Sequence, residues 1–295
     1  MFAGNGQGGS TDGKGVASFA GAYGIVMDKD GNLFASDYKN TLIRKIGPDG
    51  TVTTFAGNVT GVSSGHAASV DGTGTNASFM APAGMAIDGA GNIYVADQLS
   101  IRMITPGGVV TTLPGSSYFK NSDFLQVTLD ASGNIYASDA GNKVILKINT
   151  DGTSGIYATG GDLANSPFHG ALGLVFDGSG NLFFADGDNS VRKISPAKTI
   201  SLVAGIPMTS GFANGAGNQA TFFNLVGIAR DATGNLFVSD YGNRAIREIL
   251  PDGSVSTVVV TPGANTPSGP SDMVFDAAGN LFLANGQSIL KITLN

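Results

Sequence analysis

The sequence predicts an all-β fold: a six-bladed β-propeller of four-stranded antiparallel blades, forming a single domain over residues 1–295. A pattern close to Asp-x-x-Gly-Asn-(Leu/Ile)-(Phe/Tyr)-x-(Ala/Ser)-Asp occurs six times. Its glycines lie 42 to 60 residues apart, a period typical of propeller blades. Of the 22 acidic residues only Glu248 is Glu, and 45 residues are Gly, which favours turns over helices. The six repeats begin at Asp28, Asp88, Asp130, Asp177, Asp231 and Asp276.

The fifth repeat shows the strands of one blade in order. Residues 227–230, 236–239, 245–249 and 254–259 are short segments whose apolar positions are rich in β-branched and aromatic residues, as expected for strands. Between the first two, Asp231 accepts backbone N–H groups and Gly234 supplies the positive φ of a tight hairpin. One such sheet cannot bury both of its faces alone, but six sheets packed around an axis can.

The two ends of the chain predict how the ring closes. The sixth repeat stops after its third strand, near Ile292, whereas Phe2-Ala3-Gly4-Asn5 matches Phe55-Ala56-Gly57-Asn58 at the end of the first blade. We therefore expect the N-terminal segment to complete the last blade and to cover its edge. The equivalent of residues 51–54 is missing, so the chain is expected to be a monomer or part of a larger polypeptide.

Composition excludes several classes of function. The net charge is −6 with only 16 Lys and Arg, so no global field attracts nucleic acid. The absence of cysteine excludes disulfides, thiolate metal sites and a Cys nucleophile, and it fits an exported bacterial protein. No apolar segment reaches transmembrane length, so no membrane insertion is expected. Residues 1–15 lack the basic and apolar segments of a signal peptide, which export would already have removed.

The repeats resemble the NHL-repeat family, of the bacterial type. The resemblance rests on Gly-Ile-Ala-x-Asp from residue 227, Gly-Asn-Leu-Phe-Val-Ser-Asp from 234, the turn at 241–244 and Ile-Arg-x-Ile from 246. It covers essentially the whole chain, and the connectors at 12–19, 71–79 and 214–222 add to it. The resemblance implies a six-bladed propeller. It implies function poorly, because the family includes receptor sensor domains, RNA binders and a few lyases.

An acidic residue recurs at the end of the second strand. One interpretation is a ring of carboxylates that binds cations or sugars. The other is a turn-capping Asp bonded to backbone N–H groups and to a nearby Arg, which the recurrence with the repeat favours. The residues concerned are Asp37, Asp97, Asp139, Asp186 and Asp240, with Arg44, Arg102, Arg192 and Arg247 on the third strands.

Few residues could support metal or acid–base chemistry. The chain has two histidines, His66 and His169, so a three-His zinc site is excluded. The resemblance implies histidine-rich metal chemistry for the family's amidating lyases, which this chain cannot reproduce. The hairpin from Asp28 resembles the start of a calcium loop but lacks the distal Glu. We expect no metal and no cofactor, and His169 is either a general base or an ordinary loop residue.

Blades 3 and 6 depart from the repeat. Four blades have Gly near the start of the first strand, whereas blade 3 has Gln126 and blade 6 has Asp272. The same two blades have Leu146 and Leu290 in place of the Arg. Blades 3 and 6 face each other across a six-bladed ring. The departures therefore indicate an ancestral three-blade duplication, a specialised axis across the channel, or neutral drift.

A propeller opens its blade-to-blade connectors on one face, here called the long-loop face, and the Asp-x-x-Gly-Asn hairpins on the other, the hairpin face. The long-loop face holds connectors 4–22, 57–82 and 205–225, whose length is typical of functional loops. Aromatic side chains on a neutral polar face suit sugars or peptides, the alternative being loop packing. The predicted ligand-binding residues are Gln126, Asp272, His169, Tyr23 and Tyr241, and Tyr38, Tyr118, Phe119 and Phe168 are further rim aromatics.

Three functions compete. The leading hypothesis is a non-catalytic module of an exported, cell-surface or periplasmic bacterial protein that binds a glycan, a peptide or a protein. The second is a lyase or hydrolase that uses Asp272 or His169 at the channel mouth, against which the missing Cys, Glu and His residues count. The third is RNA binding, which requires a basic face that 16 Lys and Arg do not supply.

Overall fold

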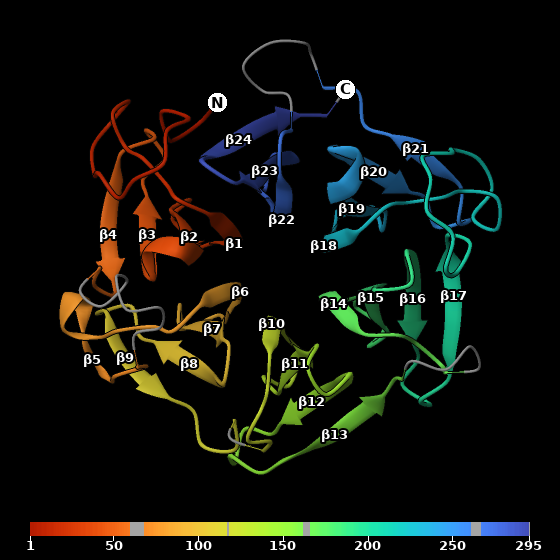
Figure 1. Cartoon of the computed structure of the whole chain (residues 1–295), viewed down its shortest axis with the longest axis horizontal. Coiled ribbons are helices and arrows are strands. Elements are labelled where there is room, and N and C mark those ends of the chain that lie inside the picture. The colour runs from red at the N-terminus through yellow and green to blue at the C-terminus, as the bar shows by residue number, and fades with distance from the viewer. Residues whose placement is uncertain (60–67, 117, 162–165, 261–266, 295) are drawn as a thin grey trace.

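The computed structural model describes residues 1–59, 68–116, 118–161, 166–260 and 267–294 and has the predicted all-β architecture. Six antiparallel sheets stand like blades around a central axis (Figure 1). Blades 1 to 3 comprise β1 (Ala22–Met27), β2 (Leu33–Asp37), β3 (Leu42–Ile46) and β4 (Val52–Ala56); β5 (Gly72–Thr73), β6 (Pro82–Ile87), β7 (Ile93–Asp97), β8 (Ser100–Ile104) and β9 (Val109–Thr112); and β10 (Phe124–Leu129), β11 (Ile135–Asp139), β12 (Val144–Ile148) and β13 (Ser154–Thr159).

In the second half of the ring the first strand of each blade again lies nearest the axis and later strands lie further out (Figure 1). Among the described residues no helix is long and apolar enough to cross a membrane. Blades 4 to 6 comprise β14 (Ala171–Phe176), β15 (Leu182–Asp186), β16 (Ser190–Ile194) and β17 (Ile200–Ala204); β18 (Leu225–Arg230), β19 (Leu236–Asp240), β20 (Ala245–Ile249) and β21 (Val255–Thr257); and β22 (Pro270–Phe275), β23 (Asn280–Asn285) and β24 (Ser288–Thr293).

The N-terminal segment closes the ring as predicted. Ala3 pairs with Ile289 of β24, and the backbone N–H groups of Phe2 and Ala3 both donate to the Ile289 carbonyl. The Phe2 ring packs against Phe282 with centroids 5.1 Å apart. Blade 6 is therefore a three-stranded sheet whose fourth position is a short bridge. Blade 2 departs in the other direction, because β5 from connector 57–82 adds a fifth, outer strand to β9.

Each Asp-x-x-Gly-Asn segment is a tight hairpin. In blade 1 the Asp28 carboxylate accepts the N–H groups of Asp30 and Asn32 and the Asn32 side-chain amide. Gly31 lies at φ 79° and closes the turn. The same bonds recur in the other five hairpins, so these carboxylates are engaged in forming the turns.

The core lies between the blades, not within them. Each of six clusters of buried apolar residues joins the facing sheets of two neighbouring blades. At the axis the first strands approach closely enough to require glycine. A Cβ on Gly24 or Gly227 would lie within 3 Å of a backbone carbonyl of the next blade. Side chains at this level of the channel therefore come from Gln126 and Asp272 instead.

Candidate functional site

Three buried arginines hold two long connectors and the N-terminal segment against the blades. Arg44, whose side chain is fully buried, donates from Nη1 to Asp37 (2.9 Å) and from Nη2 to Asp12 (2.7 Å) and lies over the Phe19 ring. Asp37 also accepts the N–H groups of Ala20 and Gly21. The turn-capping interpretation of these pairs is thus confirmed. Arg102 and Arg247 repeat the arrangement in blades 2 and 5 with Asp97, Asp71, Asp240 and Asn214.

Two of these capping Asp residues position tyrosines on the long-loop face. After Asp37 and Asp240 the chain forms short 3₁₀ turns, η1 (Tyr38–Asn40) and η4 (Tyr241–Asn243), each closed by a residue in the left-handed conformation. The first residue of each turn therefore projects from the end of its blade. Tyr38 is 41% exposed and Tyr241 is 45% exposed, so both rings are available to a ligand.

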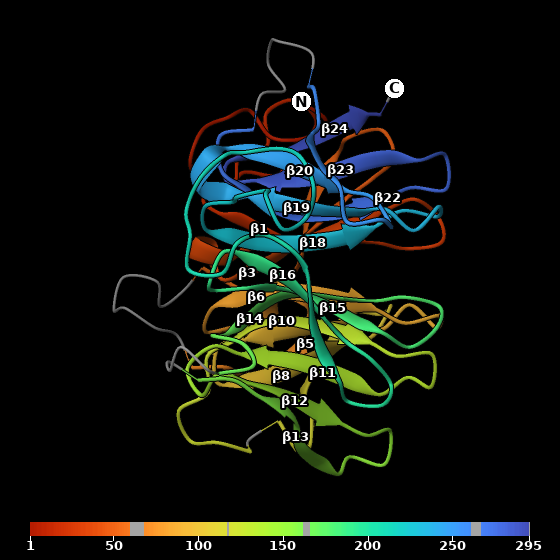
Figure 2. The same ribbon diagram turned by 90° about the vertical axis from the view of Figure 1, so that its right-hand side faces the viewer.

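A pocket of about 410 Å³ lies on the long-loop face where blades 1, 5 and 6 meet. Tyr38 and Tyr241 line it together with Tyr23 of β1, whose ring centroid lies 6.1 Å from that of Tyr38. Its polar lining includes Lys39 and the exposed side chains of Asn224 and Gln287. Figure 2 shows the connectors that bound this face opposite the hairpins. The pocket thus offers three aromatic rings and mostly neutral polar groups.

The Tyr23 hydroxyl remains a donor at neutral pH. Burial raises its pKa well above the usual value, and the nearby charges of Asp272 and Asp123 raise it further. A buried tyrosine that stays protonated can donate a hydrogen bond to a ligand oxygen without competition from ionisation.

Gln126 and Asp272 meet beneath this pocket. The Gln126 Nε2 donates to the Asp272 Oδ2 at 3.1 Å, across the ring from blade 3 to blade 6. The same carboxylate accepts the N–H groups of Ile25 and Met273. Both side chains are buried, and together with Tyr23 they line a cavity of about 10 Å³, room for about one water. Burial raises the pKa of Asp272 to about 6.

His169 lies elsewhere, in blade 4. Its Nδ1 is 3.5 Å from Asp188, and with Asp186 the three could in principle surround a cation. Arg192 already fills that role, since its Nε contacts Asp186 at 2.8 Å and its Nη2 contacts Asp188 at 2.6 Å. The remaining carboxylate oxygens accept the N–H groups of His169 and Gly170 and the Ser190 hydroxyl. His66 lies outside the described residues.

The structure groups only some of the predicted site residues. Tyr23 and Tyr241 share the pocket, Gln126 and Asp272 lie beneath it, and His169 does not line it. Phe168 is wrong as a rim aromatic, because it is fully buried against Phe184. Tyr118 and Phe119 pack edge to face on each other in the loop before β10. Lys39, Asn224 and Gln287 were missed, and only their positions in turns at the long-loop face could have indicated them.

Comparison with protein families and curated proteins gives a partial match. A family described as "Teneurin NHL domain" matches residues 61–135. Teneurin-3 of Mus musculus is 28% identical over 226 residues, which cover 60% of this chain and 8% of that protein. Teneurin-3 of Danio rerio is 28% identical over 260 residues, covering 70% and 9%. The chain therefore spans less than a tenth of the length of these relatives.

Comparison with solved structures supports the fold. A protein of unknown function from Bacteroides thetaiotaomicron has a TM-score of 0.77 at 20% identity, covering 99% of this chain and 74% of that one. An auxiliary nutrient binding protein from the same organism has a TM-score of 0.72 at 14% identity, covering 97% and 73%. A streptogramin B lyase has a TM-score of 0.63 at 17% identity, covering 94% of both chains. Such identities establish a common fold, and function has to be argued from the site.

Proposed function

We propose that this chain, a six-bladed β-propeller that is similar to a Teneurin NHL domain over residues 61–135, is a non-catalytic binding module. The pocket formed by Tyr23, Tyr38 and Tyr241 binds a glycan. A larger bacterial polypeptide, exported to the cell surface or the periplasm, presents the module to that ligand.

The pocket of three tyrosines carries this proposal. Aromatic rings offer flat apolar faces to the C–H surface of a sugar, and their hydroxyls offer polar edges. The side-chain amides of Asn224 and Gln287 supply both donors and acceptors, which suits hydroxyl groups that do both. Among the described residues that line the pocket, Lys39 alone is charged, so a neutral ligand fits better than a strongly charged one.

The position of the pocket also favours binding. Pairs such as Arg44 with Asp37 fix the connectors through fully buried side chains, so the surroundings are largely preformed. Two neighbours in fold are named auxiliary nutrient binding proteins, from Bacteroides thetaiotaomicron and Bacteroides ovatus. Their names are consistent with a binding role for this chain.

An enzyme is the alternative, and Asp272 is the observation that favours it. A carboxyl group whose pKa burial raises to about 6 has the acidity of a general acid or base near neutral pH. Its oxygens, however, accept bonds from Gln126, Ile25 and Met273, and it is buried below the pocket. A substrate in the pocket would meet Tyr23 first, so binding without catalysis is the better account.

The test is a glycan array and a peptide array probed with the parent chain and with two pocket variants, Tyr38→Ala and Tyr241→Ala. Loss of a buried aromatic contact typically costs more than about 1 kcal/mol, so each variant should bind at least about fivefold more weakly. Tyr118→Ala removes a tyrosine of equal exposure (45%) outside the pocket and serves as the matched control. Selection of peptides alone, or equal binding by all four proteins, would contradict the proposal.

A further inference from the structure

On the hairpin face, three side chains fill the wedge between neighbouring blades. They are the aromatic residue of the second strand, a residue of the fourth strand or its equivalent, and the residue just before the next blade's hairpin. Between blades 1 and 2 these are Phe34, Phe55 and Ile87, with the two rings 5.0 Å apart. Between blades 6 and 1 they are Phe282, Phe2 and Met27.

The wedge between blades 4 and 5 differs from these two. Phe183 has no aromatic partner among the described residues there, since Val203 stands where blade 1 has Phe55. The residue before the hairpin is Arg230, whereas the other five blades have apolar side chains in that column. The result is a groove of about 470 Å³, against about 300 Å³ for the wedge between blades 1 and 2. The apolar residues of the column are Met27, Ile87, Leu129, Phe176 and Phe275.

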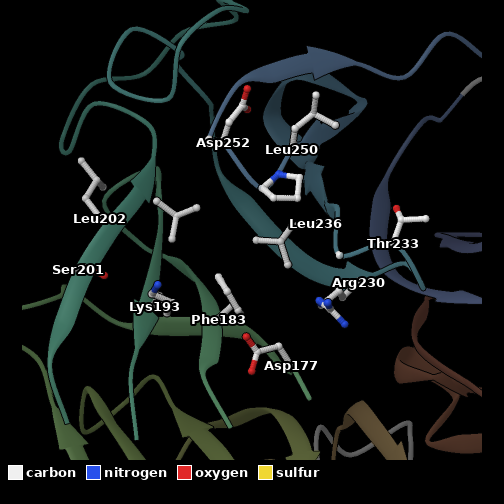
Figure 3. A pocket seen from close by; sticks show the side chains of 14 residues that line it. Asp177, Phe183, Lys193, Ser201, Leu202, Arg230, Thr233, Leu236, Leu250 and Asp252 are labelled. Atoms are coloured by element: carbon white, nitrogen blue, oxygen red, sulfur yellow. The ribbon is translucent and has the colours of Figure 1, made fainter. Parts of the chain in front are cut away.

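Two half-buried cations line this groove on opposite sides of Phe183 (Figure 3). The Lys193 Nζ lies 5.9 Å from the Phe183 ring centroid. In the part of the chain that the structure describes, neither Lys193 nor Arg230 forms an ion pair or a hydrogen bond. The charge of Arg230 interacts with Asp177 only beyond ion-pair distance, so both cations can still donate charge-assisted hydrogen bonds to a ligand anion.

The acids of the groove are already engaged. Asp177 accepts the N–H groups of Ser179 and Asn181 and the Asn181 amide within its hairpin. Asp252, at the β20–β21 turn, accepts the N–H and the hydroxyl of Ser254. Both carboxylates line the groove, and Asp177 lies near Arg230 (Figure 3), so they disfavour a doubly charged ligand such as phosphate. A monoanion fits the balance of charge better.

We propose that this groove is a second binding site, which takes an organic carboxylate with an apolar body. The carboxylate lies between Arg230 and Lys193, since a guanidinium can hold both oxygens in a bidentate pair. The apolar body packs on Phe183, Val203, Leu236, Leu250 and Pro251, which line the same groove. The site lies on the hairpin face, so it is independent of the tyrosine pocket.

The test is calorimetric titration with three probes of one shape. Phenylacetate carries the required charge and ring, phenylacetamide is its neutral analogue, and phenethylamine is its cationic analogue. Phenylacetate should bind saturably, and phenylacetamide at least about tenfold more weakly, because it lacks the charge-assisted bonds. Phenethylamine should not bind, and inorganic phosphate should not compete. Equal affinity for acid and amide, or no saturable binding of phenylacetate, would overturn the proposal.

Two variants locate the site by different physical changes. Arg230→Leu restores the apolar column, as blade 3 has Leu129, and removes the main cation. Val203→Phe keeps both cations but fills the groove as Phe55 does in blade 1. Each should weaken phenylacetate binding at least about tenfold, with folding confirmed by an unchanged β-sheet circular dichroism spectrum.

The matched control is Lys45→Met, because Lys45 lies over Phe34 in the wedge between blades 1 and 2 as Lys193 lies over Phe183. This variant should bind phenylacetate like the parent. Parent-like binding by Arg230→Leu, or by a folded Val203→Phe, would place the carboxylate elsewhere and refute the assignment.

Discussion

Asp272→Asn should change how the stability of the propeller depends on pH. Burial raises the Asp272 pKa from 3.8 to about 6 in the folded state. The folded chain therefore binds more protons than the unfolded chain between about pH 4 and 6, so stability falls as pH rises through that window. At about 1.36 kcal/mol per pKa unit, the ionised Asp272 costs about 3 kcal/mol above pH 6.

The Asp272→Asn variant lacks this titration. An asparagine at this position carries no charge and so avoids the cost of burying one. Its side-chain NH₂ group, however, can face the NH₂ group of Gln126, which would destabilise the variant at every pH. The change of stability with pH is therefore more informative than the stability itself. Urea unfolding of parent and variant at pH 4 and pH 7 gives the quantity required. The stability difference, variant minus parent, should be about 2.4 kcal/mol larger at pH 7 than at pH 4, because the unfolded carboxyl is already partly ionised at pH 4.

Other buried carboxyl groups titrate in both proteins and cancel in this difference. Asp30→Asn, which removes an exposed hairpin carboxylate, is the control for the loss of one acidic side chain. A difference for Asp272→Asn that does not vary between pH 4 and 7 would refute the reasoning, because it would show that Asp272 is not held as a desolvated acid.

Three further predictions concern closure, hairpins and the channel. Deleting residues 1–5 should lower the melting temperature by a few degrees, because the Ala3 bridge and Phe2 packing are lost; an unchanged melting curve would mean that the clasp contributes nothing. Gly234→Val should destabilise by about 1–3 kcal/mol in urea unfolding, because Gly234 lies at φ 102°; parent-like stability would contradict this. Replacing Gln126 and Asp272 by Gly should preserve folding but weaken glycan binding at least about fivefold by leaving Tyr23 without support, and equal binding would indicate that the two departures arose by drift.

The repeated features could be predicted from the sequence because their causes are local. The hairpin at Asp231 follows from one carboxylate, one Gly and one Asn within five residues. The pairing of Ala3 with Ile289 could also be predicted, because Phe2-Ala3-Gly4-Asn5 copies a segment with a known place in another blade. In a repeat protein, a long-range contact can therefore be predicted from the place that the same segment occupies in another repeat.

Features outside the repeat depended on contacts that no local pattern reveals. β5 pairs with β9 because Arg102 holds Asp71 in place, 31 residues away along the chain. The contact of Gln126 with Asp272 spans 146 residues. The sequence shows Arg230 as a charged residue at a position that is apolar in the other five blades. The groove that Arg230 lines is evident only in the structure, where Val203 and Phe183 leave it open.

A crystal structure of the chain with the glycan that binds most strongly on the array is the sharpest test of whether the tyrosine pocket of the long-loop face binds a neutral glycan. Sugar rings should stack on Tyr38 and Tyr241, with the Tyr23 hydroxyl donating to a sugar oxygen. A glycan bound at the hairpin face, or on the outer edges of the blades away from these tyrosines, would contradict that expectation.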